Sequence, residues 1–257
     1  MSQTDGVPPA TVFVDADNTL WDTDRVFAEA QLGLLSGVEA ATGTPCPVSD
    51  RLGYVRAIDQ AIAARHHSGL RYPAKLLIKA TALALSGKGA VEAARASRLG
   101  TAPSHLPASS EEEIEALYWR ALKAVPVLRP GVMAGLSALQ DAGCAVLIVS
   151  EAARGKVETV IGATGLEGHF TRVIEGQKRP ELYRRVLRLA RLPKRAFMIG
   201  DQLDRDIAPA KAAGLATIYF PGGFRPEWTP DAAEVGPDFT ITDFSEAARI
   251  IVASPDA

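Results

Sequence analysis

The fold is constrained most by five short apolar runs, rich in β-branched residues and bounded by polar or turn residues. Runs of this length and composition are typical of buried strands. From residue 131 onward they alternate with stretches of helical spacing at about 132–142, 153–164, 180–190, 205–213 and 245–252. The alternation predicts βαβ units, and therefore an α/β fold in which helices cover both faces of a parallel sheet. The predicted strands are Thr11–Val14, Ala145–Val149, Arg172–Ile174, Ala196–Ile199 and Ala216–Phe220.

The segment between Trp21 and about Val125 follows a different pattern. It contains no convincing strand, whereas Ala, Leu and Arg recur at helical spacing in roughly five stretches. We therefore predict an all-helical domain at residues 22–125, inserted into an α/β core domain that is formed by residues 1–21 and 126–257. Its helices are expected to start near Asp24, after residues 47–50, at Pro73, near Gly89 and around Ser109 and Ser110.

Composition narrows the class of partner. The 28 Lys and Arg residues against 30 Asp and Glu residues give a net charge of -2, so no excess of positive charge attracts nucleic acid or anionic lipid. The longest apolar run, Cys144–Val149, is too short to cross a bilayer, and the first ten residues show no leader pattern. Two cysteines cannot form a disulfide framework. We expect a cytoplasmic protein with a small-molecule partner, and the sequence predicts no oligomeric state.

Acidic residues follow two of the predicted strands. Asp15 and Asp17 come directly after the first strand, where alternate residues of an extended segment share a face. Asp201 follows the fourth strand, and Asp206 lies in the next helical turn. The carboxyl ends of parallel strands line the crevice where ligands bind. Carboxylates that converge there repel one another unless a cation joins them, and oxygen ligands favour Mg²⁺.

Two further polar groups are expected at the same edge of the sheet. Ser150 ends the second strand, and a cation follows the third strand, either Lys178 or Arg179. Paired acids, a metal pocket, a hydroxyl and a positive charge together suit the transfer of a phosphoryl group through a charged transition state. The P-loop, dinucleotide, serine hydrolase and zinc protease motifs are absent from the sequence.

These segments resemble a known family. In chain order, DADNTL, LIVS, a lysine before a helix and MIGDQLDRD are similar to the four motifs of the haloacid dehalogenase-like (HAD) superfamily. The resemblance covers residues 10–20 and 126–250, and the helical insertion lies where that superfamily's first type of cap domain lies. It implies a Rossmann-like core domain with a helical cap at residues 22–125.

The resemblance also implies roles for the two acids of the first motif. Asp15 would be the nucleophile that forms an aspartyl-phosphate, and Asp17 would protonate the leaving group and then activate water. Dehalogenases of the superfamily lack an aspartate at the position of Asp17, whereas its phosphatases and phosphomutases have one. Dehalogenation is therefore disfavoured.

For the metal, the resemblance implies that Asp15, the main-chain carbonyl of Asp17, and Asp201 hold Mg²⁺, with Asp206 supporting them indirectly. Ser150, Lys178 and Asn18 would hold the phosphoryl oxygens.

The sequence departs from the family pattern in two places. The lysine motif is often Lys-Pro, but here it reads Lys178-Arg179-Pro180, so that Arg179 competes for the phosphate role; we favour Lys178. After Ser150 the sequence is Glu151-Ala152-Ala153, where many relatives carry Asn or Gly-rich residues.

Simpler roles remain open for several of these residues. Asp15 and Asp17 could close a turn, Ser150 could cap the following helix, and Asp204 is expected to be a plain cap or solvent residue. Residues 65–67 and 71–72, which carry Arg, His and Tyr, could reach a substrate, but we favour a role at a helix end.

The leading hypothesis is a Mg²⁺-dependent phosphatase, a HAD-like phosphoric monoester hydrolase, acting on a small phosphorylated metabolite. The alternatives are a phosphotransferase or phosphomutase that uses the same residues, and a non-catalytic binding scaffold of the same fold.

Overall fold

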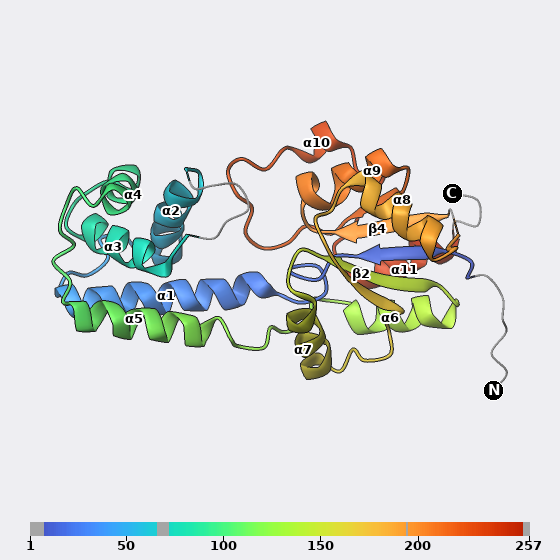
Figure 1. The fold of residues 1–257 in the computed structure, drawn as a ribbon, viewed down its shortest axis with the longest axis horizontal. Coiled ribbons are helices and arrows are strands. Elements are labelled where there is room, and N and C mark those ends of the chain that lie inside the picture. Colours follow the sequence, from blue (N-terminus) through green and yellow to red (C-terminus); the bar gives the residue numbers. More distant parts are fainter. Residues whose placement is uncertain (1–7, 66–71, 194, 254–257) are drawn as a thin grey trace. The chain divides into compact units, whose positions relative to one another are not determined.

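The computed structural model describes residues 8–65, 72–193 and 195–253. Contacts divide the chain into two compact units (Figure 1). The first, called the core unit, consists of Met1–Asp24 and Val125–Ala257, and the second, called the helical unit, consists of Arg25–Ala124. The assignment of the helical unit as a cap domain stays a prediction.

The core unit is built on one parallel sheet with the strand order β3-β2-β1-β4-β5-β6. The five strands expected from the sequence are present, and β1 lies between β2 and β4, so its end faces two neighbouring strand ends. The strands are β1 (Thr11–Val14), β2 (Ala145–Ser150), β3 (Arg172–Glu175), β4 (Ala196–Gly200), β5 (Ala216–Tyr219) and β6 (Phe239–Thr240).

Helices cover both faces of this sheet, which confirms the predicted α/β class (Figure 1). Successive residues of a strand point to opposite faces, so Val12 and Val14 of β1 pack with α6, α7 and α11, whereas Phe13 packs with α8 and α9. Both sets are apolar because neither face is open to water. The helices are α6 (Val132–Asp141), α7 (Arg154–Thr164), α8 (Pro180–Leu189), α9 (Ala208–Ala213), α10 (Ala232–Val235) and α11 (Phe244–Ala253).

The described residues of the helical unit form five helices whose apolar stripes meet in one buried cluster. Leu34, Leu35 and Val38 of α1 contribute one stripe, at the three-to-four-residue spacing of an amphipathic helix. Asp50 caps α2, since its Oδ1 accepts a hydrogen bond from the Gly53 N–H at 2.8 Å. The helices are α1 (Thr23–Thr42), α2 (Arg51–Ala63), α3 (Ala74–Leu85), α4 (Ala90–Leu99) and α5 (Ala108–Ala121).

One predicted helix differs in detail. The stretch expected at 205–213 begins as a π-helical turn, η1 (Leu203–Ile207), and continues as α9. The Ile207 N–H reaches back five residues to the Gln202 carbonyl at 3.2 Å, and this wider turn places Asp206. Within the described residues, no helix combines the length and the apolar character that a membrane span requires.

Candidate active site

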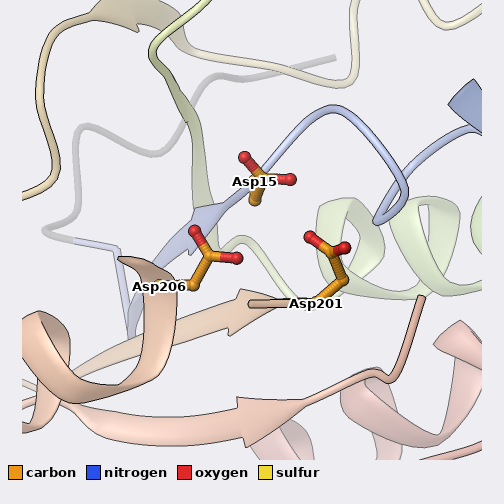
Figure 2. A group of neighbouring side chains, drawn as sticks. All are labelled: Asp15, Asp201 and Asp206. Atoms are coloured by element: carbon orange, nitrogen blue, oxygen red, sulfur yellow. The ribbon is translucent and has the colours of Figure 1, made fainter. Parts of the chain in front are cut away.

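The site forms where β1 and β4 end side by side. Val14 is in register with Ile199, and the Asp15 N–H donates to the Ile199 carbonyl at 2.9 Å. Asp15 and Asp201 therefore leave the sheet at the same edge, as expected for residues that directly follow adjacent parallel strands (Figure 2). Both carboxylates point into the space between the strand ends (Figure 2).

Asp206 reaches the same space from the π-helical turn η1 (Figure 2). Its Oδ2 accepts a hydrogen bond from the Gln202 N–H at 2.9 Å, while its own N–H donates to the Gln202 carbonyl at 2.8 Å. Gly200 makes this possible, because a Cβ at that position would lie 2.4 Å from the Asp206 Cβ. The glycine that ends β4 thus allows Asp206 to lie against the strand.

The three carboxylates form one cluster, in which Asp15 and Asp206 are buried and Asp201 is half-buried. One oxygen from each of Asp15, Asp201 and Asp206 lies within 4.8 Å of the others. Lys178 joins them: its Nζ donates to Asp15 Oδ1 and, at 2.6 Å, to Asp206 Oδ1. The side chains of this lysine and these two aspartates are at most 7 % exposed. When ionised, the three carboxylates outnumber the one ammonium group, and little of the cluster is exposed to solvent.

The electrostatics of the cluster reflect this imbalance. Burial raises the pKa of Asp15 to about 7, although Lys178 opposes the change. Burial also raises the pKa of Asp201 well above its usual value, and the charges of Asp15 and Asp206 raise it further. Burial lowers the pKa of Lys178, but Asp15 and Asp206 outweigh that effect and raise it. The raised pKa values of Asp15 and Asp201 mean that their ionised forms are disfavoured here unless a further positive charge is bound.

A divalent cation fits this arrangement. The Oδ1 atom of Asp201 is buried and has no hydrogen-bond partner among the described residues, which is costly for a carboxylate unless another group completes it. The ligand atoms that the three carboxylates offer are all oxygens, and oxygens are the ligands that Mg²⁺ and similar hard cations prefer. The residues present therefore fit the metal that the carboxylate pattern predicts.

Asp17 lies outside the cluster in this structure. Its Oδ1 accepts hydrogen bonds from Trp21 Nε1 at 3.0 Å and from Thr23 Oγ1 at 2.7 Å. Asn18 has a φ of 60°, unusual for a residue other than glycine, and its Oδ1 accepts from the Asp24 N–H at 2.7 Å. The sequence alone did not predict these contacts of Asp17 and Asn18 with the start of α1.

Ser150 and Lys178 lie where the sequence places them. Ser150 is buried at the end of β2, and its Oγ accepts a hydrogen bond from the Ala152 N–H at 3.1 Å. This bond does not cap α7, because the N-cap residue of that helix is Ala153 and no side chain caps it. Lys178 reaches the cluster, whereas Arg179 is exposed at the N-cap position of α8. Of the two competing cations, the structure brings Lys178 to the carboxylates. Asp204 is exposed, as expected.

The cluster of Arg and His residues at 65–67 and 71–72 is described only at its two ends. Arg65 is exposed at the end of α2, and Tyr72 donates a hydrogen bond to Asp59 in the helical unit. His66, His67 and Arg71 lie outside the described residues.

Two further residues, Arg129 and Gly222, lie at the rim of the site. Arg129 donates to the main-chain carbonyls of Asn18, Phe220 and Pro221. Gly222 passes so close to the cluster that a Cβ there would lie 2.6 Å from Asp201 Oδ2. Contacts with the main chain, such as those of Arg129, cannot be recognised from a pattern of residues in a single sequence.

Comparison with known proteins identifies the family. A sequence model described as haloacid dehalogenase-like hydrolase matches residues 9–214. The chain belongs to this family. The predicted membership in the HAD superfamily is therefore confirmed.

Curated relatives of this HAD-family chain are phosphatases. It is 27 % identical over 156 residues to a phosphoglycolate phosphatase of Pasteurella multocida, covering 55 % of this chain and 68 % of the relative. It is 30 % identical over 142 residues to a phosphoserine phosphatase of Thermus thermophilus, covering 52 % and 55 %. These names place the chain among the phosphoric monoester hydrolases of the HAD family, as predicted.

A solved structure shares the fold along nearly the whole HAD-family chain. A haloacid dehalogenase-like hydrolase from Xanthomonas campestris superimposes with a TM-score of 0.63 at 22 % identity, covering 97 % of this chain and 99 % of that one. At this identity the similarity shows the fold alone.

Proposed function

We propose that the protein is a Mg²⁺-dependent phosphatase that hydrolyses a small phosphorylated metabolite through an aspartyl-phosphate on Asp15. The observation that carries this proposal is the group of Asp15, Asp201, Asp206 and Lys178, in which a buried Asp201 oxygen has no partner among the described residues. A cation and a phosphoryl group supply the charges that this arrangement lacks.

The hydrogen bonds of Asp206 indicate its role at the metal site. Both carboxylate oxygens of Asp206 accept hydrogen bonds, one from Lys178 and one from the Gln202 N–H. We therefore assign Asp206 a supporting role. The direct contacts are assigned to Asp15, Asp201 and the main-chain carbonyl of Asp17, as the resemblance to the HAD superfamily implies. When bound, Mg²⁺ neutralises the charge of the phosphoryl oxygens as the transition state develops.

Asp15 acts as the nucleophile. One of its carboxylate oxygens attacks phosphorus, the bond from phosphorus to the leaving oxygen breaks, and that oxygen takes a proton from Asp17. Asp17 then removes a proton from water, the water oxygen attacks phosphorus, and the acyl-phosphate bond breaks to release inorganic phosphate and restore Asp15. Since Trp21 and Thr23 occupy Asp17 Oδ1, we assign the proton transfer to Oδ2.

Three residues are assigned to the phosphoryl oxygens. The Lys178 ammonium has three donors, of which two contact Asp15 and Asp206, and the third is directed to the substrate. Ser150 contributes its hydroxyl proton, because its oxygen already accepts from Ala152. Asn18 contributes its side-chain N–H, because its Oδ1 accepts from Asp24.

The substrate class rests on the relatives. Relatives that the chain resembles are named for phosphoglycolate, phosphoserine and ribulose-1,5-bisphosphate, all of them small phosphorylated metabolites. We propose a substrate of that size, a cytoplasmic location, no nucleic-acid or membrane partner, and a cap role for the helical unit.

The test is phosphate release from a panel of phosphorylated metabolites and one aryl phosphate, with Mg²⁺ and with EDTA. Asp15→Asn is expected to abolish release while leaving the fold intact, and Asp204→Asn, which removes an exposed carboxylate from η1, is the matched control and should keep full activity. Full activity of Asp15→Asn would contradict the mechanism. Phosphorylated product without free phosphate would indicate a phosphotransferase instead.

A further inference from the structure

Arg129 connects two loops at the rim of the site. Its Nη1 donates to the Asn18 carbonyl at 2.5 Å and to the Phe220 carbonyl at 3.1 Å, and its Nη2 donates to the Pro221 carbonyl at 2.7 Å. The guanidinium carbon lies 3.5 Å from the centroid of the Phe220 ring. Three carbonyls and one aromatic face therefore fix the plane of this side chain.

The backbone of Arg129 is also fixed. Its N–H donates to the Leu20 carbonyl at 3.0 Å, and Leu128 pairs with Trp21 in an antiparallel bridge. The side chain thus extends from a segment that is already joined to the turn after β1. Because its backbone and its guanidinium group are both held, the Arg129 side chain loses little further conformational entropy when it orients the carbonyl groups that it contacts.

The first loop that Arg129 contacts carries Asp15, Asp17 and Asn18. Asn18 adopts a left-handed conformation, with a φ of 60°, that costs a residue with a Cβ free energy. Two local hydrogen bonds hold it: its N–H donates to the Trp21 carbonyl at 2.8 Å, and its Oδ1 accepts from the Asp24 N–H. Arg129 holds the remaining backbone group, the Asn18 carbonyl, one residue from the Asp17 carbonyl assigned to the metal.

The second loop lies against Asp201. The Phe220 N–H donates to the Gly200 carbonyl at 2.9 Å, directly before Asp201 in the chain. Gly222 follows, and a Cβ there would lie 2.6 Å from Asp201 Oδ2 and 3.1 Å from the Asn18 Cβ. The position of this loop therefore limits where the Asp201 carboxylate can lie.

We propose that Arg129 is a positioning residue that sets the spacing between these two loops, and thereby holds the Asp17 carbonyl and the Asp201 carboxylate at the distance that Mg²⁺ requires. The inference rests on the proposed function for the identity of the metal. Arg129 itself touches neither the metal nor the substrate in this scheme. Its effect is on the affinity for Mg²⁺ and on turnover.

The test compares Arg129→Met and Arg129→Lys with Arg195→Met in the full chain. Arg195 is a matched control, because it also donates to main-chain carbonyls, those of Pro9 and Ile251, and lies over an aromatic ring, that of Phe197. Arg195 directly precedes β4, whereas Asp201 directly follows it, so the two residues lie at opposite ends of this strand. Losing either arginine should lower the thermal unfolding temperature in EDTA.

Mg²⁺ affinity separates positioning from general stability. By calorimetry without substrate, Arg129→Met should bind Mg²⁺ on the order of tenfold more weakly than the wild type, the usual loss when a group that orients metal ligands is removed. Arg195→Met should keep wild-type affinity. Arg129→Lys should resemble Arg129→Met, because one ammonium nitrogen cannot replace two guanidinium nitrogens that donate to three carbonyls.

Each outcome decides the inference. It is overturned by wild-type Mg²⁺ affinity and wild-type kcat in Arg129→Met, by a lysine variant that equals the wild type, or by an equal loss of affinity in Arg195→Met. A wild-type protein that binds Mg²⁺ but releases no phosphate from any substrate would reject the proposed function and leave the calorimetric comparison decisive for Arg129. A wild-type protein that binds no Mg²⁺ would reject both.

Discussion

Asp59 provides a test of how the helical unit is stabilised. Its carboxylate is largely buried, accepts a hydrogen bond from Tyr72 and contacts Gln31, and Arg56 is the nearby positive charge. Burial raises its pKa from the usual 3.8 to about 6, although Gln31 and Arg56 oppose the change. A carboxyl group whose pKa is higher in the folded state binds its proton more tightly there, so it favours the folded state at low pH and loses that contribution as pH rises through about 6.

The magnitude follows from the pKa difference. Each pKa unit corresponds to about 1.4 kcal/mol, so the shift from 3.8 to about 6 amounts to about 3 kcal/mol between pH 8 and pH 3. About half of it is gained between pH 8 and pH 5, where most proteins can be handled. Asp59→Asn keeps an oxygen that accepts from Tyr72 and removes the titration, so its stability should lack this dependence.

The assay is denaturant unfolding of the full chain at pH 8 and pH 5, followed by circular dichroism. The free energy of unfolding of the wild type should rise relative to that of Asp59→Asn by about 1.4 kcal/mol at the lower pH. Glu113→Gln removes an exposed carboxyl group from α5 of the same unit and should follow the wild type. A wild type and an Asp59→Asn variant that change in parallel between the two pH values would refute the reasoning.

Two further predictions concern the carboxylate cluster. Lys178→Met leaves Asp15 and Asp206 without their ammonium partner. We therefore expect kcat to fall on the order of 10²-fold or more, and Mg²⁺ to raise the unfolding temperature more than in the wild type. An unchanged kcat would remove Lys178 from the site. Gly200→Ala places a Cβ against Asp206. We therefore expect calorimetry to show weaker Mg²⁺ binding, and the free energy of unfolding to fall by about 1–3 kcal/mol. Wild-type values for both quantities would show that η1 adjusts to the added methyl group.

The sheet could be predicted from the sequence because it is buried on both faces. Val12, Phe13 and Val14 are all apolar although they point to alternate faces, and such continuous runs are easy to recognise. The short strand β6 was not predicted, since Phe239 and Thr240 are both exposed and too few to form a run. The π-helical turn was also missed. The spacing of apolar residues does not show whether a backbone N–H bonds to the fourth preceding residue, as in an α-helix, or to the fifth, as in a π-helix.

The candidate site was predictable where it depends on strand ends. Asp15 and Asp201 follow adjacent parallel strands, so the order of elements was enough to bring them together. The choice between Lys178 and Arg179 needed the structure, because these residues are neighbours in the chain and only the local geometry decides which one turns inward. Arg129 was beyond sequence analysis, since its partners are main-chain carbonyls that every residue possesses.

The helical unit leaves and rejoins the core unit at one place. The Asp22 N–H donates to the Val127 carbonyl at 2.8 Å, although about a hundred residues of chain separate the two. Each doubling of the length of a closed loop costs only about 0.6 kcal/mol, so an insertion of this length is compatible with a hydrogen bond that joins its two ends. Asp15, Lys178, Asp201 and Asp206 all belong to the core unit. The core unit alone therefore supplies the side chains of this cluster, although the chain leaves that unit for about a hundred residues between its first strand and its second.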